Sequence, residues 1–190
     1  MKYLTSTFVN TLENKVERQI AFTLKILQNL SEEQLTKKPS AGGWSILEIL
    51  DHLNSYGDYY LPLISSAIKA SPEERHLFFK SGLLGNYFVQ MINPLTGTKS
   101  IGAAKRHLPR VAKKPDQVVY EFIRQEELLL QSLFSARSIN LEHARIPVSI
   151  AKIIRLKLGD VFLFVIHHID RHLLQASKLL EEKEGYTVAE

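Results

Sequence analysis

The sequence predicts an all-α protein, a four-helix bundle with a long, partly helical connection between its second and third helices. Three observations favour this fold class. Four long segments carry apolar residues at steps of three and four, the spacing of an amphipathic helix. No segment shows a convincing alternation of apolar and polar residues, and no internal repeat is present. We therefore expect negligible strand content and helices that bury their apolar faces against one another.

The first predicted helix covers residues 6–30, where apolar residues recur along one face. Ser31 follows it as the N-cap of a further helical turn. Pro39 and the pair Gly42-Gly43 then interrupt the chain.

The second predicted helix has a sharp start. Ser45 and Glu48 have the spacing of a capping box, and Trp44 stands where a hydrophobic staple would be. The apolar pattern continues to about Ala70, and Pro72 marks the end of the helix.

Residues 72–114 are irregular and rich in glycine and proline. A connection of that length without structure is unusual in a compact domain. Residues 77–92 are predicted to form a short helical piece, broken near Gly85. Residues 93–114 are expected to arch over the bundle, so that residues 76–110 form the rim or lid of a cavity.

The last two helices follow the same rules. Pro115 suits the first turn of the third helix, which ends near Ala136. Another connection follows, in which residues 147–158 fit an extended or a helical conformation. The fourth helix is predicted to run from Gly159 to about Glu182.

The composition limits the classes of function. A chain of 190 residues with 45% hydrophobic content fits a single domain, residues 1–190. The absence of cysteine excludes disulfides, a cysteine metal site and a protein thiol nucleophile. The net charge of +4 comes from scattered basic residues, so no nucleic-acid partner is expected. No apolar run is long enough for a membrane span or a signal core, which predicts a cytoplasmic protein without a membrane partner.

Two histidines in the fourth helix are the strongest candidates for chemistry. His168 and His172 are four residues apart on an apolar stripe, which places them about 6 Å apart along one helix face. Buried polar groups without partners cost about 1–3 kcal/mol each, and a shared metal ion would satisfy both. His52, on the second helix, would make a third ligand and leave one coordination position open. The alternative is that each is a core histidine bonded to a carbonyl group.

Other polar residues receive supporting or structural roles. Gln175, one turn beyond His172, could orient a ligand or bond a backbone carbonyl. His167 is rotated about 100° from His168, and it is expected to support a metal ligand from behind, to pack on a neighbour or to lie at an oligomer contact. Asp51 and Asp170 could be carboxylates that hydrogen-bond to the metal ligands, but such residues more often face solvent in a salt bridge. Three more histidines lie in connections: His76, His107 and His143. Of these, His107 is interpreted as a solvated loop residue.

Together these motifs resemble those of the DinB-like (YfiT-like) superfamily of helical-bundle metal-dependent enzymes. One matching segment runs from Trp44 to Leu53 and reads W-S-x-x-E-x-x-x-H-L. The other runs from Gly159 to Gln175 and ends in H-x-x-x-H-x-x-Q. The stretch from Gly97 to Leu108 also looks like the central connection of the family.

The resemblance implies a divalent metal ion, zinc or nickel, bound by His52, His168 and His172. It also implies a homodimer. Characterised relatives include thiol S-transferases and a maleylpyruvate isomerase, which use low-molecular-weight thiols. We therefore expect a metal-dependent enzyme acting on a small molecule, by thiol S-transfer or by hydrolysis. The alternatives are a non-catalytic stress-response bundle that binds a metal or ligand, and a metal-free dimerisation domain.

Overall fold

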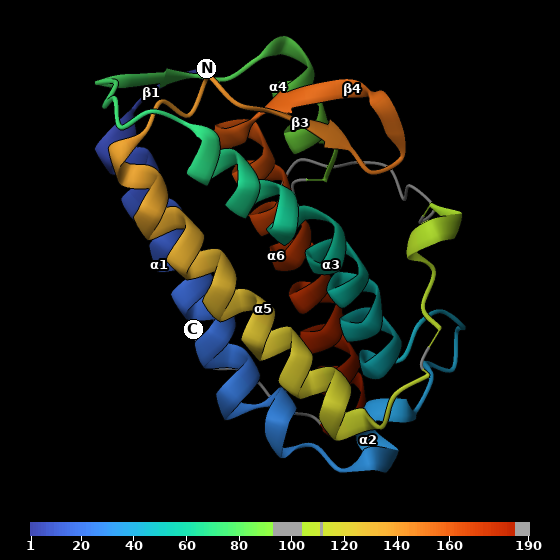
Figure 1. Cartoon of the computed structure of the whole chain (residues 1–190). Coiled ribbons are helices and arrows are strands. Elements are labelled where there is room, and N and C mark those ends of the chain that lie inside the picture. The colour runs from blue at the N-terminus through green and yellow to red at the C-terminus, as the bar shows by residue number, and fades with distance from the viewer. Residues whose placement is uncertain (93–103, 111, 185–190) are drawn as a thin grey trace.

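The fold is a bundle of four long helices, as the sequence predicts (Figure 1). The computed structural model describes residues 1–92, 104–110 and 112–184, with side chains up to residue 181. The bundle helices are α1 (Thr5–Lys25), α3 (Ile46–Ala70), α5 (Pro115–Ser135) and α6 (Leu158–Glu184).

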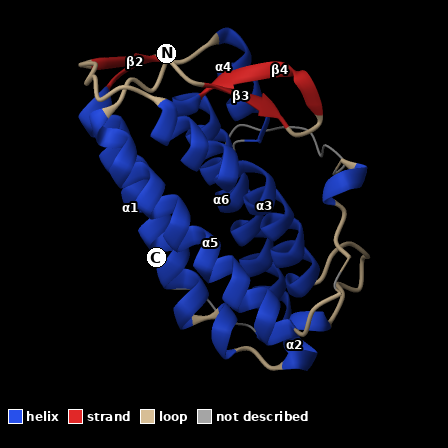
Figure 2. Ribbon diagram, in the orientation of Figure 1, coloured by secondary structure: helices blue, strands red, loops and turns tan. Residues whose placement is uncertain are grey.

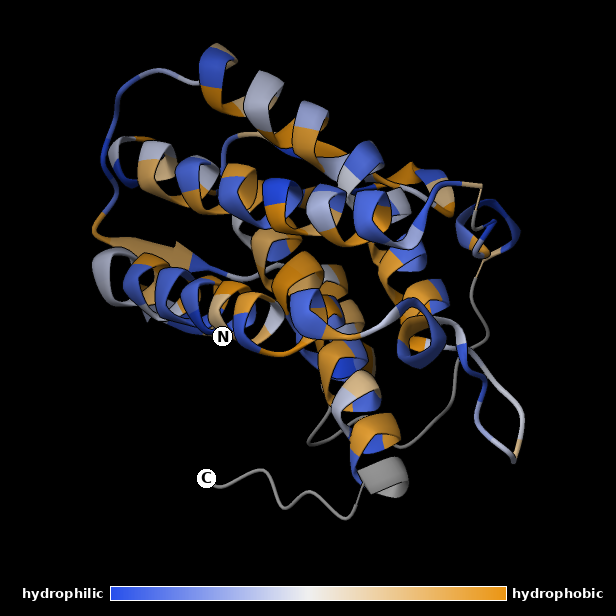
Figure 3. Ribbon diagram, turned by 90° about the horizontal axis from the view of Figure 1, so that it is seen from below, coloured by the Kyte–Doolittle hydropathy of each residue, from blue (hydrophilic) through white to orange (hydrophobic). Residues whose placement is uncertain are grey.

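The four helices do not pack in the order of the chain. α1 packs against α5 and α6, and α3 also packs against α5 and α6. The consecutive helices α1 and α3 therefore occupy diagonal corners of the bundle. Figure 3 shows hydrophobic residues concentrated toward the centre. The core there includes side chains with 2% exposure or less from every bundle helix: Val16, Leu50, Phe122 and Phe162.

The helix starts follow the capping signals in the sequence. Ser45 accepts a hydrogen bond from the backbone N–H of Glu48, whose carboxylate accepts from the Ser45 N–H, so the predicted capping box is present. Ser31 caps the short helix α2 (Glu32–Thr36) in the same way. Short 3-10 turns extend α1 and α5: η1 (Leu27–Asn29) and η3 (Ala136–Ser138).

The fold contains two small sheets, although negligible strand content was expected, and one of them lies mostly within residues 147–158, where the sequence leaves an extended conformation open (Figure 2). β1 (Lys2–Leu4) pairs with β2 (Phe78–Lys80), and β3 (Arg145–Val148) pairs with β4 (Ala151–Lys157), both antiparallel. These strands lie at one end of the bundle. The β3–β4 hairpin lacks a clear alternating pattern because β4 buries little of its surface; Ile153 is 97% exposed.

The predicted break at Gly85 was also wrong, because Gly85 lies inside the continuous helix α4 (Leu83–Ile92). A Cβ at this position would lie 2.2 Å from Cγ of Asp160, so glycine is needed for close packing. The buried Asp160 carboxylate accepts bonds from the Ser81 hydroxyl (2.6 Å) and the Gly82 N–H (3.0 Å). These contacts dock α4 against the start of α6.

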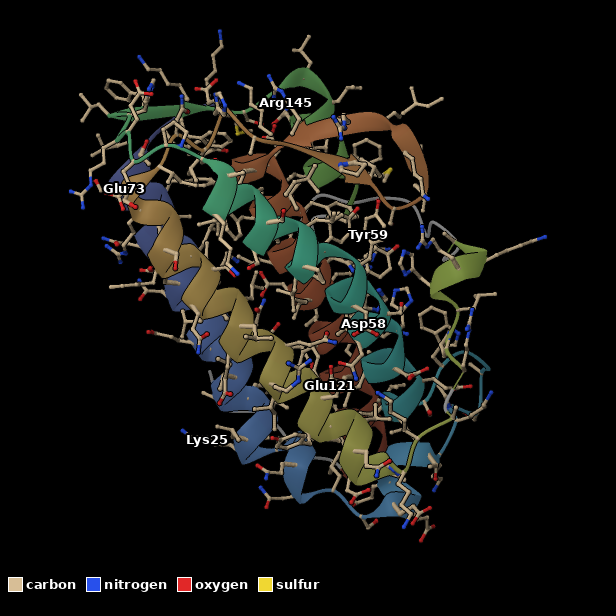
Figure 4. The ribbon with its side chains drawn as sticks, viewed as in Figure 1. Lys25, Asp58, Tyr59, Glu73, Glu121 and Arg145 are labelled. Carbon is tan, nitrogen blue, oxygen red and sulfur yellow. The ribbon has the colours of Figure 1, made fainter. Side chains whose placement is uncertain are left out.

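A short segment beside α3 belongs to the predicted arch, of which residues 93–103 and 111 lie outside the described residues. It contains the 3-10 turn η2 (Lys105–His107). The Arg110 N–H donates to Asp51 Oδ2 (2.7 Å), and the Arg106 guanidinium lies 4.7 Å from the ring centre of Tyr59, which Figure 4 labels on α3. Asp51 thus anchors this segment to α3.

None of the helices described combines the length and the apolar character needed to cross a membrane.

Candidate metal centre

Helices α3 and α6 bring the three predicted histidines together. One ring nitrogen from each of His52, His168 and His172 lies within 4.8 Å of the others. His52 Nε2 and His168 Nε2 are 3.4 Å apart. The two α6 residues share a face because they are four positions apart, and His52 meets them from the second turn of α3. The arrangement has the ligand types and spacing that one divalent ion requires.

Hydrogen bonds fix the tautomers of two of these rings. His52 Nδ1 lies 2.6 Å from the carbonyl oxygen of His107, and His172 Nδ1 lies 3.0 Å from Gln175 Oε1. Both oxygens can only accept, so each Nδ1 carries the proton and each Nε2 keeps a free lone pair. Metal-ligating histidines are commonly oriented in this way. The bond from His172 gives Gln175 the role of orienting this ring.

Burial keeps all three rings neutral near pH 7. It lowers the pKa of His52 and lowers that of His172 to about 4. The pKa of His168 lies well below its usual range, because the ring is buried and His172 and His52 are close. A neutral imidazole is the form that binds a metal ion, so the free protein already holds the ligand form.

Aromatic side chains surround the cluster. The Trp44 ring centre lies 4.7 Å from that of His52 and 6.0 Å from that of His172, so this residue packs on the cluster. Phe164 stacks on His168 at 5.9 Å. Tyr56 contacts His168 at 4.3 Å, and burial raises its pKa to about 12, which keeps the hydroxyl protonated.

The histidines lie in the wall of a cavity of about 540 Å³, which we call the outer cavity. Its volume falls in the range of small-molecule sites, about 300–1,000 Å³. Most of its lining is apolar or aromatic, with Arg171, Gln175 and Ser149 among the polar residues. The apolar lining includes residues of α4 and of the β3–β4 turn: Phe88, Met91, Ile92, Val148 and Ile150.

The interpretation of His107 as a solvated loop residue was wrong. Its side chain is 2% exposed and stacks on Tyr56 with ring centres 3.9 Å apart. The Ser55 hydroxyl donates to the His52 carbonyl (2.7 Å), so its oxygen accepts from His107 Nδ1 (2.9 Å). His107 is buried because its turn docks on α3, a tertiary contact that the neighbouring basic residues do not indicate.

The polar residues on the other side of α6 face α1, and packing on a neighbour is one of the roles considered for His167. Asp170 accepts hydrogen bonds from Lys15 (2.7 Å) and Gln19 (2.6 Å). His167 Nδ1 lies 3.9 Å from Asp170 Oδ2, beyond hydrogen-bond distance. These residues form an interhelical contact separate from the histidine cluster. The loop histidines His76 and His143 are exposed.

Glu126 on α5 was not predicted to have any role. It is 2% exposed, and burial raises the pKa of its carboxyl well above the usual range, with a further contribution from Asp170. Its Oε2 atom has no hydrogen-bond partner among the described residues. The available signal was its position, because Glu126 is four residues from Phe122 on the buried stripe of α5.

The fold and the site define a helical-bundle protein with a three-histidine cluster in the wall of a small-molecule cavity. A match to the sequence profile of the DinB superfamily over residues 15–176 shows that the chain belongs to this family.

The fold is also similar to that of YfiT from Bacillus subtilis, with a TM-score of 0.55 and 11% sequence identity. The similarity covers 96% of this chain and 89% of YfiT, which is described as a probable metal-dependent hydrolase with an unusual four-helix bundle topology. The comparison with curated proteins finds no match.

Proposed function

We propose that the protein is a divalent-metal-dependent enzyme that acts on a small molecule in the outer cavity, by hydrolysis or by thiol S-transfer. The observation that carries this proposal is the cluster itself: three ring nitrogens within 4.8 Å of one another, from two buried histidines and the half-buried His172, in a cavity wall. The description of YfiT as a probable metal-dependent hydrolase supports it.

The ligands would be His52, His168 and His172, with zinc or nickel as the ion. Three protein ligands and an open position are typical of catalytic rather than structural zinc sites. When bound, such an ion supplies Lewis acidity and lowers the pKa of a water molecule or thiol.

The remaining groups position the ligands and the substrate. The His107 carbonyl and Gln175 hold two of the imidazoles in the tautomer that leaves Nε2 free. The apolar walls favour a substrate with a compact apolar or aromatic body. The Tyr56 hydroxyl, protonated at neutral pH, is available in the lining as a hydrogen-bond donor.

Hydrolysis and thiol transfer differ in where the nucleophile comes from. The chain has no cysteine, so in either reaction the nucleophile enters the cavity as water or as a low-molecular-weight cosubstrate. A cavity of about 540 Å³ has room for such a molecule. Its open volume favours turnover over the non-catalytic alternative, for which a blocked cavity is expected.

The test begins with metal content. Protein purified without a histidine tag is reconstituted with zinc or nickel and analysed for bound metal beside His168→Ala. We expect about one ion per chain in the wild type. Lack of stoichiometric metal after reconstitution would refute the proposal.

The metal-loaded protein is then assayed with ester and amide substrates, and with aryl electrophiles in the presence of glutathione, cysteine or coenzyme A. Product that depends on the thiol indicates transfer, and product without it indicates hydrolysis. Stoichiometric metal without turnover in either assay would favour the non-catalytic alternative.

A further inference from the structure

A second, smaller cavity lies in the bundle interior, and we call it the inner cavity. It has room for one water molecule, because its volume is about 10 Å³ and one water needs about 10–15 Å³. His168 and Tyr56 line both cavities and therefore form part of the wall between them. Glu126 lines the inner cavity from α5.

The inner cavity contains a polar group that lacks a partner. Glu126 is only 2% exposed, and its Oε2 has no hydrogen-bond partner among the described residues. A buried carboxyl without a partner costs free energy that a leucine at this position would avoid. Such a group in a cavity of this size indicates a bound water molecule, which needs two or more polar partners.

His168 differs from the other two histidines of the cluster in the same respect. His52 and His172 each have an acceptor for the Nδ1 proton. For His168, the polar contact seen within the described part of the chain joins Nε2 to Nε2 of His52, at 3.4 Å. Nδ1 is the other nitrogen of the ring, and it needs an acceptor if His168 is held in the same tautomer.

We infer that Glu126 is a positioning residue for the metal centre: through one water molecule in the inner cavity, its carboxyl holds the Nδ1–H group of His168. The water accepts the bond from Nδ1 and donates one to Glu126 Oε2, which gives this carboxyl oxygen the partner it lacks among the described residues. Each of the three histidines then has its own support, from the His107 carbonyl, from Gln175 and from Glu126. This inference rests on the proposed metal binding.

The test compares metal affinity with stability in Glu126→Leu. Removal of groups that orient a metal ligand typically weakens binding about 10–100-fold. We expect a zinc dissociation constant about ten-fold higher by chelator competition, together with a higher melting temperature for the metal-free protein. A residue with a purely structural role would change the stability and leave the affinity unchanged.

Two further variants complete the test. Glu126→Gln keeps an acceptor oxygen and should restore affinity to within about three-fold of the wild type. Thr5→Val, at the start of α1, removes another buried oxygen that has no partner among the described residues, and it should leave the affinity unchanged. A crystal structure of the zinc-loaded wild type should show the water between Glu126 and His168.

The outcomes separate this inference from the proposed function. If the wild type binds no metal, the proposed function fails and the inference fails with it. If the wild type binds zinc, and Glu126→Leu binds it within two-fold as tightly or Glu126→Gln is as weak as Glu126→Leu, only the inference is overturned. Should Glu126→Leu fail to fold, the affinity of Glu126→Gln and the presence of the water decide.

Discussion

Helix α6 carries histidines and other polar residues on two faces, and the two faces use them differently. On the side of α3, the ring nitrogens of His168 and His172 are directed to a cluster with His52. On the side of α1, Asp170 already has Lys15 and Gln19 as partners. His167 and His168 are neighbours in the chain, yet a rotation of about 100° places them in different environments.

The difference shows what distinguishes a binding site from an interhelical contact. On the α1 face, the Asp170 carboxylate accepts from Lys15 and Gln19, although Gln19 Oε1 and His167 Nδ1 have no hydrogen-bond partner among the described residues. On the α3 face, acceptor groups bind the Nδ1 protons of His52 and His172 and leave the Nε2 lone pairs free for a ligand. Function is indicated by ring nitrogens whose free lone pairs are oriented toward one point, and the presence of histidine alone does not indicate it.

Substitution of His168 and of its neighbour His167, one at a time, should give the largest difference between the two faces of α6. His168→Ala removes a ligand and should weaken zinc binding by more than about 100-fold, beyond the range for residues that only orient a ligand. His167→Ala should change binding less than about two-fold. Competition with a chromogenic chelator measures both. Equal losses in the two variants would mean that the faces do not differ in metal binding.

The support on the α3 face can be tested separately from the ligands. Gln175→Leu removes the acceptor for the Nδ1 proton of His172 and should weaken zinc binding about ten-fold, or about 1.4 kcal/mol. Gln175→Glu keeps an acceptor oxygen and serves as the control in the same titration. Unchanged affinity in Gln175→Leu would show that the bond to His172 has no influence on the site.

A change of pH tests the α3 side further, because His107, whose carbonyl accepts from His52, is buried there. Burial lowers the pKa of His107 to about 4. An unfolded histidine has a pKa of about 6.5. Between these values the unfolded chain takes up a proton that the folded protein excludes, so stability falls as the pH falls.

For His107 this loss should be about 1 kcal/mol between about pH 7 and 5.5. Urea unfolding of metal-free wild type and His107→Asn measures it, and the variant should lose correspondingly less on acidification. Identical pH dependence in the two proteins would contradict the buried, neutral state of His107.

The smallest effect is expected on the α1 face. Asp170→Asn removes the charge that pairs with Lys15, a partly exposed contact, and should lower the free energy of unfolding by about 0.5–1 kcal/mol. Zinc affinity should not change. Urea unfolding and the chelator titration, run on the same preparation, test both halves of this prediction.

The sequence was sufficient to predict the structure where local signals alone determine it. The capping box at Ser45, the proline at the start of α5 and the four-residue spacing of His168 and His172 each determine structure within one or two turns. The four bundle helices and the juxtaposition of His52 with the α6 pair follow from these signals and from the family resemblance.

The failures share a physical cause, which is tertiary contact. Gly85 weakens a helix by its intrinsic preference, but close packing against Asp160 requires it. His107 is buried by docking of its turn on Tyr56 and Ser55. The sequence left residues 147–158 open between an extended and a helical conformation, because β4 has a largely exposed face on which Ile153 stands in place of a polar residue.

The separation of the two halves of the cluster along the chain affects the order of events in folding. His52 and His168 are 116 residues apart, so α6 must be synthesised and docked before their ring nitrogens meet. Contacts between residues so distant in sequence form slowly, because loop closure costs entropy. An ion that binds only the docked state stabilises it by mass action. Metal binding would thus stabilise only a chain whose synthesis has reached α6, and it would not stabilise a polypeptide truncated before α6.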